Sequence, residues 1–153
     1  MEETYISIML QSLKKKAAVL DEIIRLDDLQ KDRLTDSECP VEDFDQTVED
    51  KGRLIEQLGQ LDSGFEKLYA QVSEELQDNK EQYADEIRQM QSLIRSITDK
   101  SVKIQAQEAR NKDLMMQKFG VIKKHAKNLN IYRHRLSLVQ PFHRLEFRKV
   151  LGI

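Results

Sequence analysis

The sequence predicts an all-α protein, specifically an elongated antiparallel three-helix bundle or coiled coil with a flexible basic C-terminal tail. Two observations lead to this fold class. Of the 153 residues, 34% are charged and only 6% aromatic, with five Gly, two Pro and no Trp, a composition typical of long helices. Apolar residues also recur every seven positions over three long stretches, and this repeat favours helices that pack at a shallow crossing angle.

The first predicted helix spans about residues 2–34. Its apolar positions form two neighbouring columns on one face. One column is interrupted only by Asp27, and the two contain Ile6, Leu13, Leu20 and Leu34, and Leu10, Ala17 and Ile24. We expect Lys14, Lys15 and Lys16 to lie on the opposite, solvated face.

The second predicted helix spans residues 41–77. Residues 35–40 are rich in turn formers, and Pro40 suits the first turn of a helix. The short connection makes the first two helices antiparallel neighbours. The apolar repeat continues across Gly64 without a change of phase, so we expect one helix with a soft point there. The columns are Leu54, Leu61 and Leu68; Leu58, Phe65 and Val72; and Ile55, Tyr69 and Leu76.

The third predicted helix spans about residues 80–125, after a break at Asp78-Asn79 where Asn tolerates the left-handed conformation and Asp can cap the next helix. Tyr83, Met90, Ile97 and Ile104 are seven apart, but Asn111 and Lys118 then occupy this column. At ~1.5 Å per residue, the third helix passes the end of the second near residue 116. The apolar residues beyond would form an uncovered strip, which typically marks an interaction surface. Alternatively, the tail folds back and covers the strip.

The charge distribution divides the chain into a bundle, residues 1–127, and a tail, residues 128–153. Residues 118–153 hold nine Lys or Arg and one acidic residue, a net charge of +8, whereas residues 1–117 hold sixteen basic and twenty-six acidic residues, a net charge of −10. We expect the tail to be flexible alone and to order on a partner. Its aromatic residues would allow nucleic-acid binding and its basic character a membrane surface, but the acidic body argues against nucleic acid.

Catalytic patterns are missing from the sequence. There is no phosphate-binding Gly-rich loop and no nucleophile elbow. His125, His134 and His143 are nine residues apart, which is not a metal-ligand spacing on a helix. The carboxylates lie outside the apolar columns and are expected on solvated faces, and Cys39 has no nearby base. We therefore expect no enzyme, no cofactor, no metal and no membrane span, and a cytoplasmic location.

Two stretches resemble the FlgN family of flagellar export chaperones. These are KGRLIEQLGQLDSGFEKLYAQV at 51–72 and EIRQMQSLIRSITDKSVKIQAQEARNK at 86–112, and with the first helix the resemblance covers about residues 1–125. It implies a cytosolic protein of long antiparallel helices. Such chaperones bind the C-terminal segment of hook–filament junction proteins, keep it unassembled, and deliver it to the type III export gate or ATPase through their C-terminal region. The tail after Asn128 does not follow the family pattern.

These inferences together predict how the chain acts. An amphipathic C-terminal helix of a hook–filament junction protein would lie along the uncovered strip. The expected client-binding residues are Leu114, Met115, Phe119 and Ile122, with Tyr132 and Leu136 as tail anchors. Two alternatives remain: a FliT-type chaperone of the filament cap, and a structural coiled-coil tether acting by self-association. A chaperone is expected to be a monomer or weak homodimer, and a tether a stable dimer.

Overall fold

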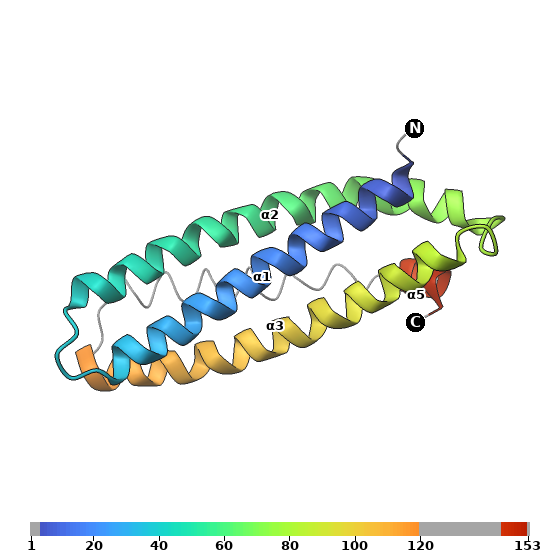
Figure 1. Ribbon diagram of the computed structural model, residues 1–153. Helices are drawn as coiled ribbons and strands as arrows, with labels where there is room; N and C mark the ends of the chain where they lie inside the picture. Colours follow the sequence, from blue (N-terminus) through green and yellow to red (C-terminus); the bar gives the residue numbers. More distant parts are fainter. Residues whose placement is uncertain (1–3, 120–144, 153) are drawn as a thin grey trace.

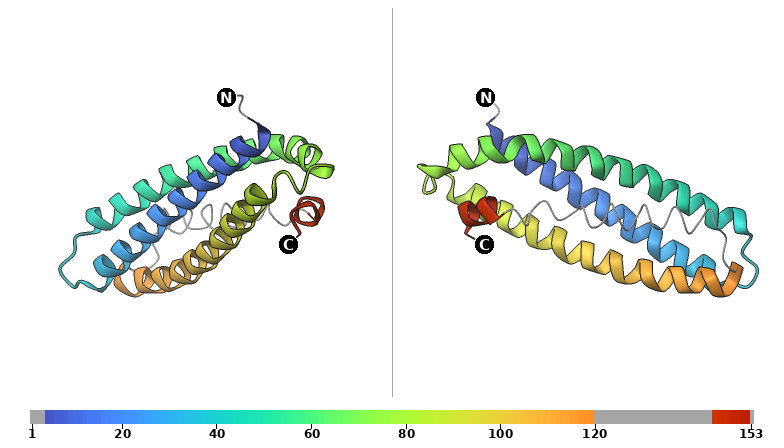
Figure 2. Two further views of the ribbon diagram at one scale, coloured as in Figure 1. Left: turned by 45° about the vertical axis from the view of Figure 1, so that its right-hand side comes forward. Right: turned by 180° about the vertical axis from the view of Figure 1, so that it is seen from behind.

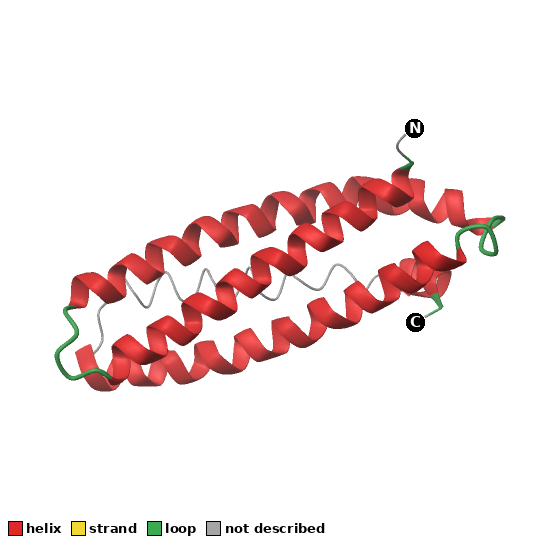
Figure 3. Cartoon of the chain, in the orientation of Figure 1, coloured by secondary structure: helices red, strands yellow, loops and turns green. Residues whose placement is uncertain are grey.

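The protein is a bundle of long helices in the computed structural model, which describes residues 4–119 and 145–152. The helices are α1 (Tyr5–Thr35), α2 (Val41–Gln77), α3 (Ala84–Phe119) and α5 (Leu145–Leu151), as labelled in Figure 1. This part of the chain contains helices and loops but no strand (Figure 3). The three long helices run side by side and alternate in direction, which confirms the predicted all-α antiparallel three-helix bundle.

The first helix is the central one. It packs along both α2 and α3, whereas α2 and α3 have little direct contact with each other. Figure 2 shows the three helices from two further directions, with the α1–α2 connection at one end and the α2–α3 turn at the other. We call these two ends of the bundle the loop end and the turn end. Because α1 has partners on two sides, its conformation depends on both other helices.

Each long helix buries residues in two columns seven apart, as in a coiled coil. In α1 the fully buried columns are Ile6, Leu13, Leu20, Asp27 and Leu34, and Met9, Lys16, Ile23 and Gln30. The predicted second column, Leu10, Ala17 and Ile24, is less completely buried than the column that contains Met9 and Ile23. The predicted columns through Leu58 and Ile55 are buried in α2, and Leu54, Leu61 and Leu68 pack at their edge.

Both ends of α1 receive a charged side chain from a neighbouring helix. At its start, Thr4 and Ser7 form a capping box, and the Glu75 carboxylate of α2 accepts hydrogen bonds from the Tyr5 and Ile6 backbone nitrogens at 3.2 and 3.3 Å. At its end, the Lys118 ammonium of α3 donates to the Arg33 carbonyl at 3.1 Å and to the Asp36 carbonyl. A carboxylate at the start and an ammonium at the end both match the helix dipole.

The second helix is continuous across its glycines, as the unbroken apolar repeat predicts. The break after it is longer than expected, because residues 78–83 form turns and α3 begins at Ala84 rather than near Lys80. Asn79 does not adopt the left-handed conformation expected of it. Its side-chain amide instead donates to the Glu75 carbonyl at 3.0 Å, and so pairs one of the last carbonyl groups of α2.

The expected overhang of the third helix does not occur within the described residues. Since α3 begins four residues later than predicted and has 36 residues to the 37 of α2, its described part reaches no further than the start of α2. Met115 lies level with Leu34 near the end of α1 and Phe44 near the start of α2, and all three side chains are buried. The expectation of an uncovered strip is therefore wrong for Met115.

The end of the expected free tail packs on the bundle. Phe147 and Leu151 of α5 are each 1% exposed and belong to the main core, where the Phe147 ring meets the Tyr69 ring edge-on with 4.8 Å between centroids. Gln91 of α3 donates a hydrogen bond to the Leu151 carbonyl. The apolar side chains of Phe147, Val150 and Leu151 explain this docking. The flexible tail predicted for residues 128–153 thus does not include α5.

Replacing Gly64 by Ala should stabilise the protein. Gly64 lies inside α2, and a Cβ atom built on it meets no heavy atom within 4 Å. Alanine there would restrict the unfolded chain and favour the helix by about 0.5–1 kcal/mol. Urea unfolding should show this increase, and Gly52→Ala, also in open space within α2, serves as a second case. A loss of stability would mean that the helix needs glycine at this point.

Candidate functional site: the polar layer and the loop end

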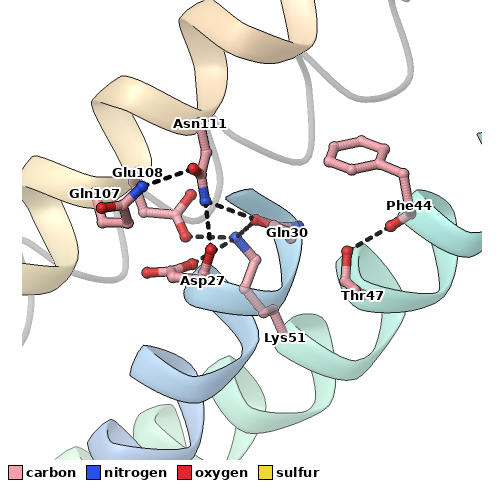
Figure 4. A network of polar contacts seen from close by, with 8 residues as sticks. All are labelled: Asp27, Gln30, Phe44, Thr47, Lys51, Gln107, Glu108 and Asn111. Carbon is pink, nitrogen blue, oxygen red and sulfur yellow. Dashed lines mark hydrogen bonds and ion pairs between the residues drawn. The ribbon is translucent and has the colours of Figure 1, made fainter. Parts of the chain in front are cut away.

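Five polar side chains from all three long helices meet inside the bundle. We call them the polar layer: Asp27 and Gln30 of α1, Lys51 of α2, and Glu108 and Asn111 of α3, each at most 4% exposed. Figure 4 shows the Lys51 side chain reaching from α2 toward the other two helices. Its ammonium lies 3.1 Å from Asp27 Oδ1 and 2.7 Å from Gln30 Oε1, and it also pairs with Glu108 Oε1.

The two amides hold the layer in one arrangement. Asn111 Nδ2 donates to the Asp27 backbone carbonyl at 3.0 Å and to Gln30 Oε1 at 3.4 Å (Figure 4). Asn111 Oδ1 accepts from Gln107 Nε2 at 2.8 Å. Gln30 Oε1 therefore accepts from both an ammonium and an amide, which fixes its orientation. Each helix contributes at least one group whose hydrogen bonds depend on another helix, so the layer links all three.

The polar layer contains two carboxyl groups and one ammonium. Asp27 Oδ2 and Glu108 Oε2 are buried and accept no hydrogen bond from the described residues. Burial raises the pKa of Asp27 to about 9, with a further contribution from the neighbouring Glu108 carboxyl and an opposing one from the Lys51 charge. A proton on Asp27 would balance the charge of the layer at neutral pH.

A second buried ion pair lies nearer the middle of the bundle. The Lys16 ammonium of α1 lies 2.5 Å from Asp62 Oδ1 of α2 and 5.5 Å from the centroid of the Phe65 ring. Lys16 is 0% exposed, so the expectation that it lies on a solvated face is wrong. Burial lowers the pKa of Lys16 and raises that of Asp62, while their mutual attraction opposes both shifts.

Beyond the polar layer, toward the loop end, lies a small separate apolar cluster. This loop-end cluster consists of Leu34, Phe44 and Met115, with Val48 and Leu114 packed against it. The main core lies on the other side of the layer and contains 18 buried apolar residues in the described part of the chain. At ~1.5–3 kcal/mol for each buried side chain, the three residues contribute about 5–9 kcal/mol before any entropy cost. Among the described residues, the loop end therefore has the smaller share of buried apolar surface.

The loop-end cluster contains two of the four predicted client-binding residues. Met115 is 2% exposed within it and Leu114 is half-buried at its edge, while the neighbouring Met116 is 43% exposed. Phe119 is the last described residue of α3, and its side chain lies outside the description. Ile122 and the predicted tail anchors Tyr132 and Leu136 also lie outside the described residues.

The polar layer was missed because charged residues were assigned to the surface. Asp27 and Glu108 are 1% and 4% exposed, so the expectation of solvated carboxylates is wrong for both. A signal was present in the sequence. Asp27 continues the Ile6–Leu13–Leu20 column, and Asn111 continues the Met90–Ile97–Ile104 column. Two polar residues at core positions of helices that pack together predict a buried polar contact.

We also searched the described residues for a metal site and for a membrane-spanning helix. They contain no group of three or more His, Cys, Asp or Glu side chains placed to hold a metal ion. None of the described helices has the length and apolar character that crossing a membrane requires. What the arrangement does provide is a buried site for one proton and, next to it, a small apolar cluster.

Comparison of the chain with models of known protein families, with curated proteins and with solved structures finds no match in any of the three.

Replacing Lys51 by Met should destabilise the bundle strongly. The change would leave two buried carboxyl groups without their cation, and breaking a buried ion pair in this way costs ~3–5 kcal/mol. Lys100→Met is the matched control, because Lys100 pairs with the exposed Asp21 and its loss should cost less than ~1 kcal/mol. Urea unfolding at pH 7 measures both. Equal losses would show that the polar layer is not an integrated network.

The stability of the protein should decrease with pH because of Asp27. Its pKa is about 9 in the folded protein and near 3.8 in the unfolded chain, so the folded state binds an extra proton between these values. This stabilisation is complete below pH 3.8 and is lost as the pH rises to about 9, at up to ~1.4 kcal/mol per pH unit. Urea unfolding at pH 5, 6, 7 and 8 should show a smaller decrease in Asp27→Asn. The exposed Asp21→Asn variant should behave as the wild type, and an unchanged slope in Asp27→Asn would refute the assignment.

Proposed function

We propose that the protein is a flagellar type III export chaperone that binds the C-terminal amphipathic helix of hook–filament junction proteins and delivers them to the export apparatus in the cytoplasm. The observation that carries this proposal is the composition of the loop end. There, residues from the predicted client-binding set form a small apolar cluster that a polar layer separates from the main core. The resemblance of residues 51–72 and 86–112 to the FlgN family supports the same function.

The mechanism follows from the composition of the loop-end cluster. A client helix would present apolar residues on one face and replace the internal contacts of Met115 and Leu114. Methionine suits this exchange because its unbranched, polarizable side chain adapts to different neighbours. Met116, already 43% exposed beside the cluster, offers a first contact. The main core need not change when the client binds, because the polar layer lies between it and the cluster.

The site proposed here includes residues whose contacts are not described. Phe119 and Ile122 follow Met115 at helical spacing in the sequence, and we propose that they extend the same client-binding surface. Tyr132 and Leu136 would contact the client or the export gate from the tail. The basic character of residues 118–153 suits a contact with the export gate if the gate surface is acidic.

Binding to purified hook–filament junction proteins tests this function. Immobilised full-length protein should retain a junction protein with a dissociation constant in the micromolar range or below. Phe119→Asp should weaken this binding at least tenfold, because it places a charge on the proposed apolar surface. Val102→Asp is the matched control, since Val102 is also on α3 but is 61% exposed and distant from the loop end. Its affinity should equal that of the wild type.

The possible results separate the site from the function. If Val102→Asp and Phe119→Asp bind the junction protein as the wild type does, the function stands and the client-binding residues are wrong. If no junction protein is retained while a filament-cap protein is, the chain acts as a FliT-type chaperone. If neither is retained and sedimentation shows a stable dimer at low micromolar concentration, the chaperone proposal fails and a self-associating tether takes its place.

A further inference from the structure

The polar layer lies between the main core and the loop-end cluster along the bundle. Asp27, Lys51 and Glu108 come from three different helices, and all three side chains are buried at this level of the bundle. The main core and the loop-end cluster are separate clusters of buried apolar residues in the described part of the chain. Within residues 4–119, the helix backbones and the polar layer connect the two clusters.

The loop end has a small apolar cluster among the described residues. Polar contacts between helices there include those of Lys118 with the Arg33 and Asp36 carbonyls, and of Arg33 with the Asp43 carbonyl. These involve exposed or half-buried atoms. The turn end has the main core, the Glu75 contacts with α1 and the packing of α5. Local opening occurs where buried apolar contacts are fewest, and among the described residues this is the loop end.

Opening of the loop end has a specific effect on the polar layer. Once water reaches the layer, the Asp27 carboxyl gains solvent, and the burial that favours its protonated form is lost. The charged groups that face Asp27 are Lys51 from α2 and Glu108 from α3, and the other members from α1 and α3, Gln30 and Asn111, are neutral amides. One cation therefore faces two carboxyl groups, and the closed layer accommodates them best when one of the carboxyl groups is protonated.

We propose that the loop end of the bundle opens as a unit, separately from the main core, and that each opening releases one proton from Asp27. The polar layer is the boundary of this unit. Deprotonation favours the open state, in which Leu34, Phe44 and Met115 become accessible. This property belongs to the free protein and does not depend on which partner the protein binds.

Hydrogen exchange of the full-length protein, measured by mass spectrometry, tests the proposal. The measured exchange rates are divided by the intrinsic exchange rates at each pH. They are measured under conditions in which the protein closes faster than an open amide exchanges, so that they report the opening equilibrium. Peptides within residues 28–50 and 104–119 should be protected at least tenfold less than peptides within residues 9–23 and 55–76. Their protection should fall ~10-fold per pH unit between pH 6 and pH 8, because one proton is released on opening.

Three variants complete the experiment. Asp27→Asn should remove the pH dependence at the loop end and increase its protection at pH 8, since asparagine imitates the protonated carboxyl. Glu108→Gln should do the same if Asp27→Asn does not fold. Asp21→Asn, at an exposed position of α1, should keep the wild-type pH dependence. Equal protection of the loop end and the main core would overturn the separate opening, and a pH dependence that persists in both layer variants would overturn the release of the proton.

Discussion

The Lys51 ammonium is buried between three helices, and this single charge constrains the position of each of them. It needs Asp27 and Gln30 at one level of α1 and Glu108 at the same level of α3. An apolar seven-residue repeat alone allows helices to slide by one repeat at little cost, whereas a slide here would leave buried charges unpaired. The Lys16–Asp62 pair requires the same alignment of α1 and α2. In antiparallel helices, residues at the same level have residue numbers with a constant sum, and for both α1–α2 ion pairs this sum is 78. The two pairs thus define one register.

This way of fixing the register affects how stability is distributed along the bundle. A layer of charged groups contributes alignment but little net stability, since desolvation offsets much of the attraction. It also isolates Leu34, Phe44 and Met115 from the main core. A binding protein can use such an arrangement: the main core keeps the fold while the isolated end rearranges around a partner. The proposed chaperone function and the weakness of the loop end are therefore compatible with the same sequence feature.

The apolar columns predicted the three long helices, the short connection predicted the antiparallel packing of the first two, and the limits of α2 followed from Pro40 and Asp78. Other features depended on tertiary contacts that periodicity does not reveal. Lys16 and Asp27 resemble surface residues until their partners, Asp62 and Lys51, are brought opposite them by the fold. The later start of α3 results from turns at residues 80–83 that contain neither Gly nor Pro. Of the candidate site, Met115 and Leu114 were identified as apolar residues near the end of α3, but the burial of Met115 depends on where α3 starts relative to α2.

The end contacts of α1 have a consequence for synthesis of the protein. During translation α1 leaves the ribosome first, but the two side chains that bind its ends come much later. Glu75 is about 70 residues from the start of the helix, and Lys118 lies 85 residues beyond Arg33. Both end contacts of α1 can therefore form only when nearly all of α3 has emerged from the ribosome. A nascent chain that stalls before that point exposes the apolar columns of α1 to other proteins in the cell, so translation speed through α3 limits how long the chain is vulnerable to aggregation.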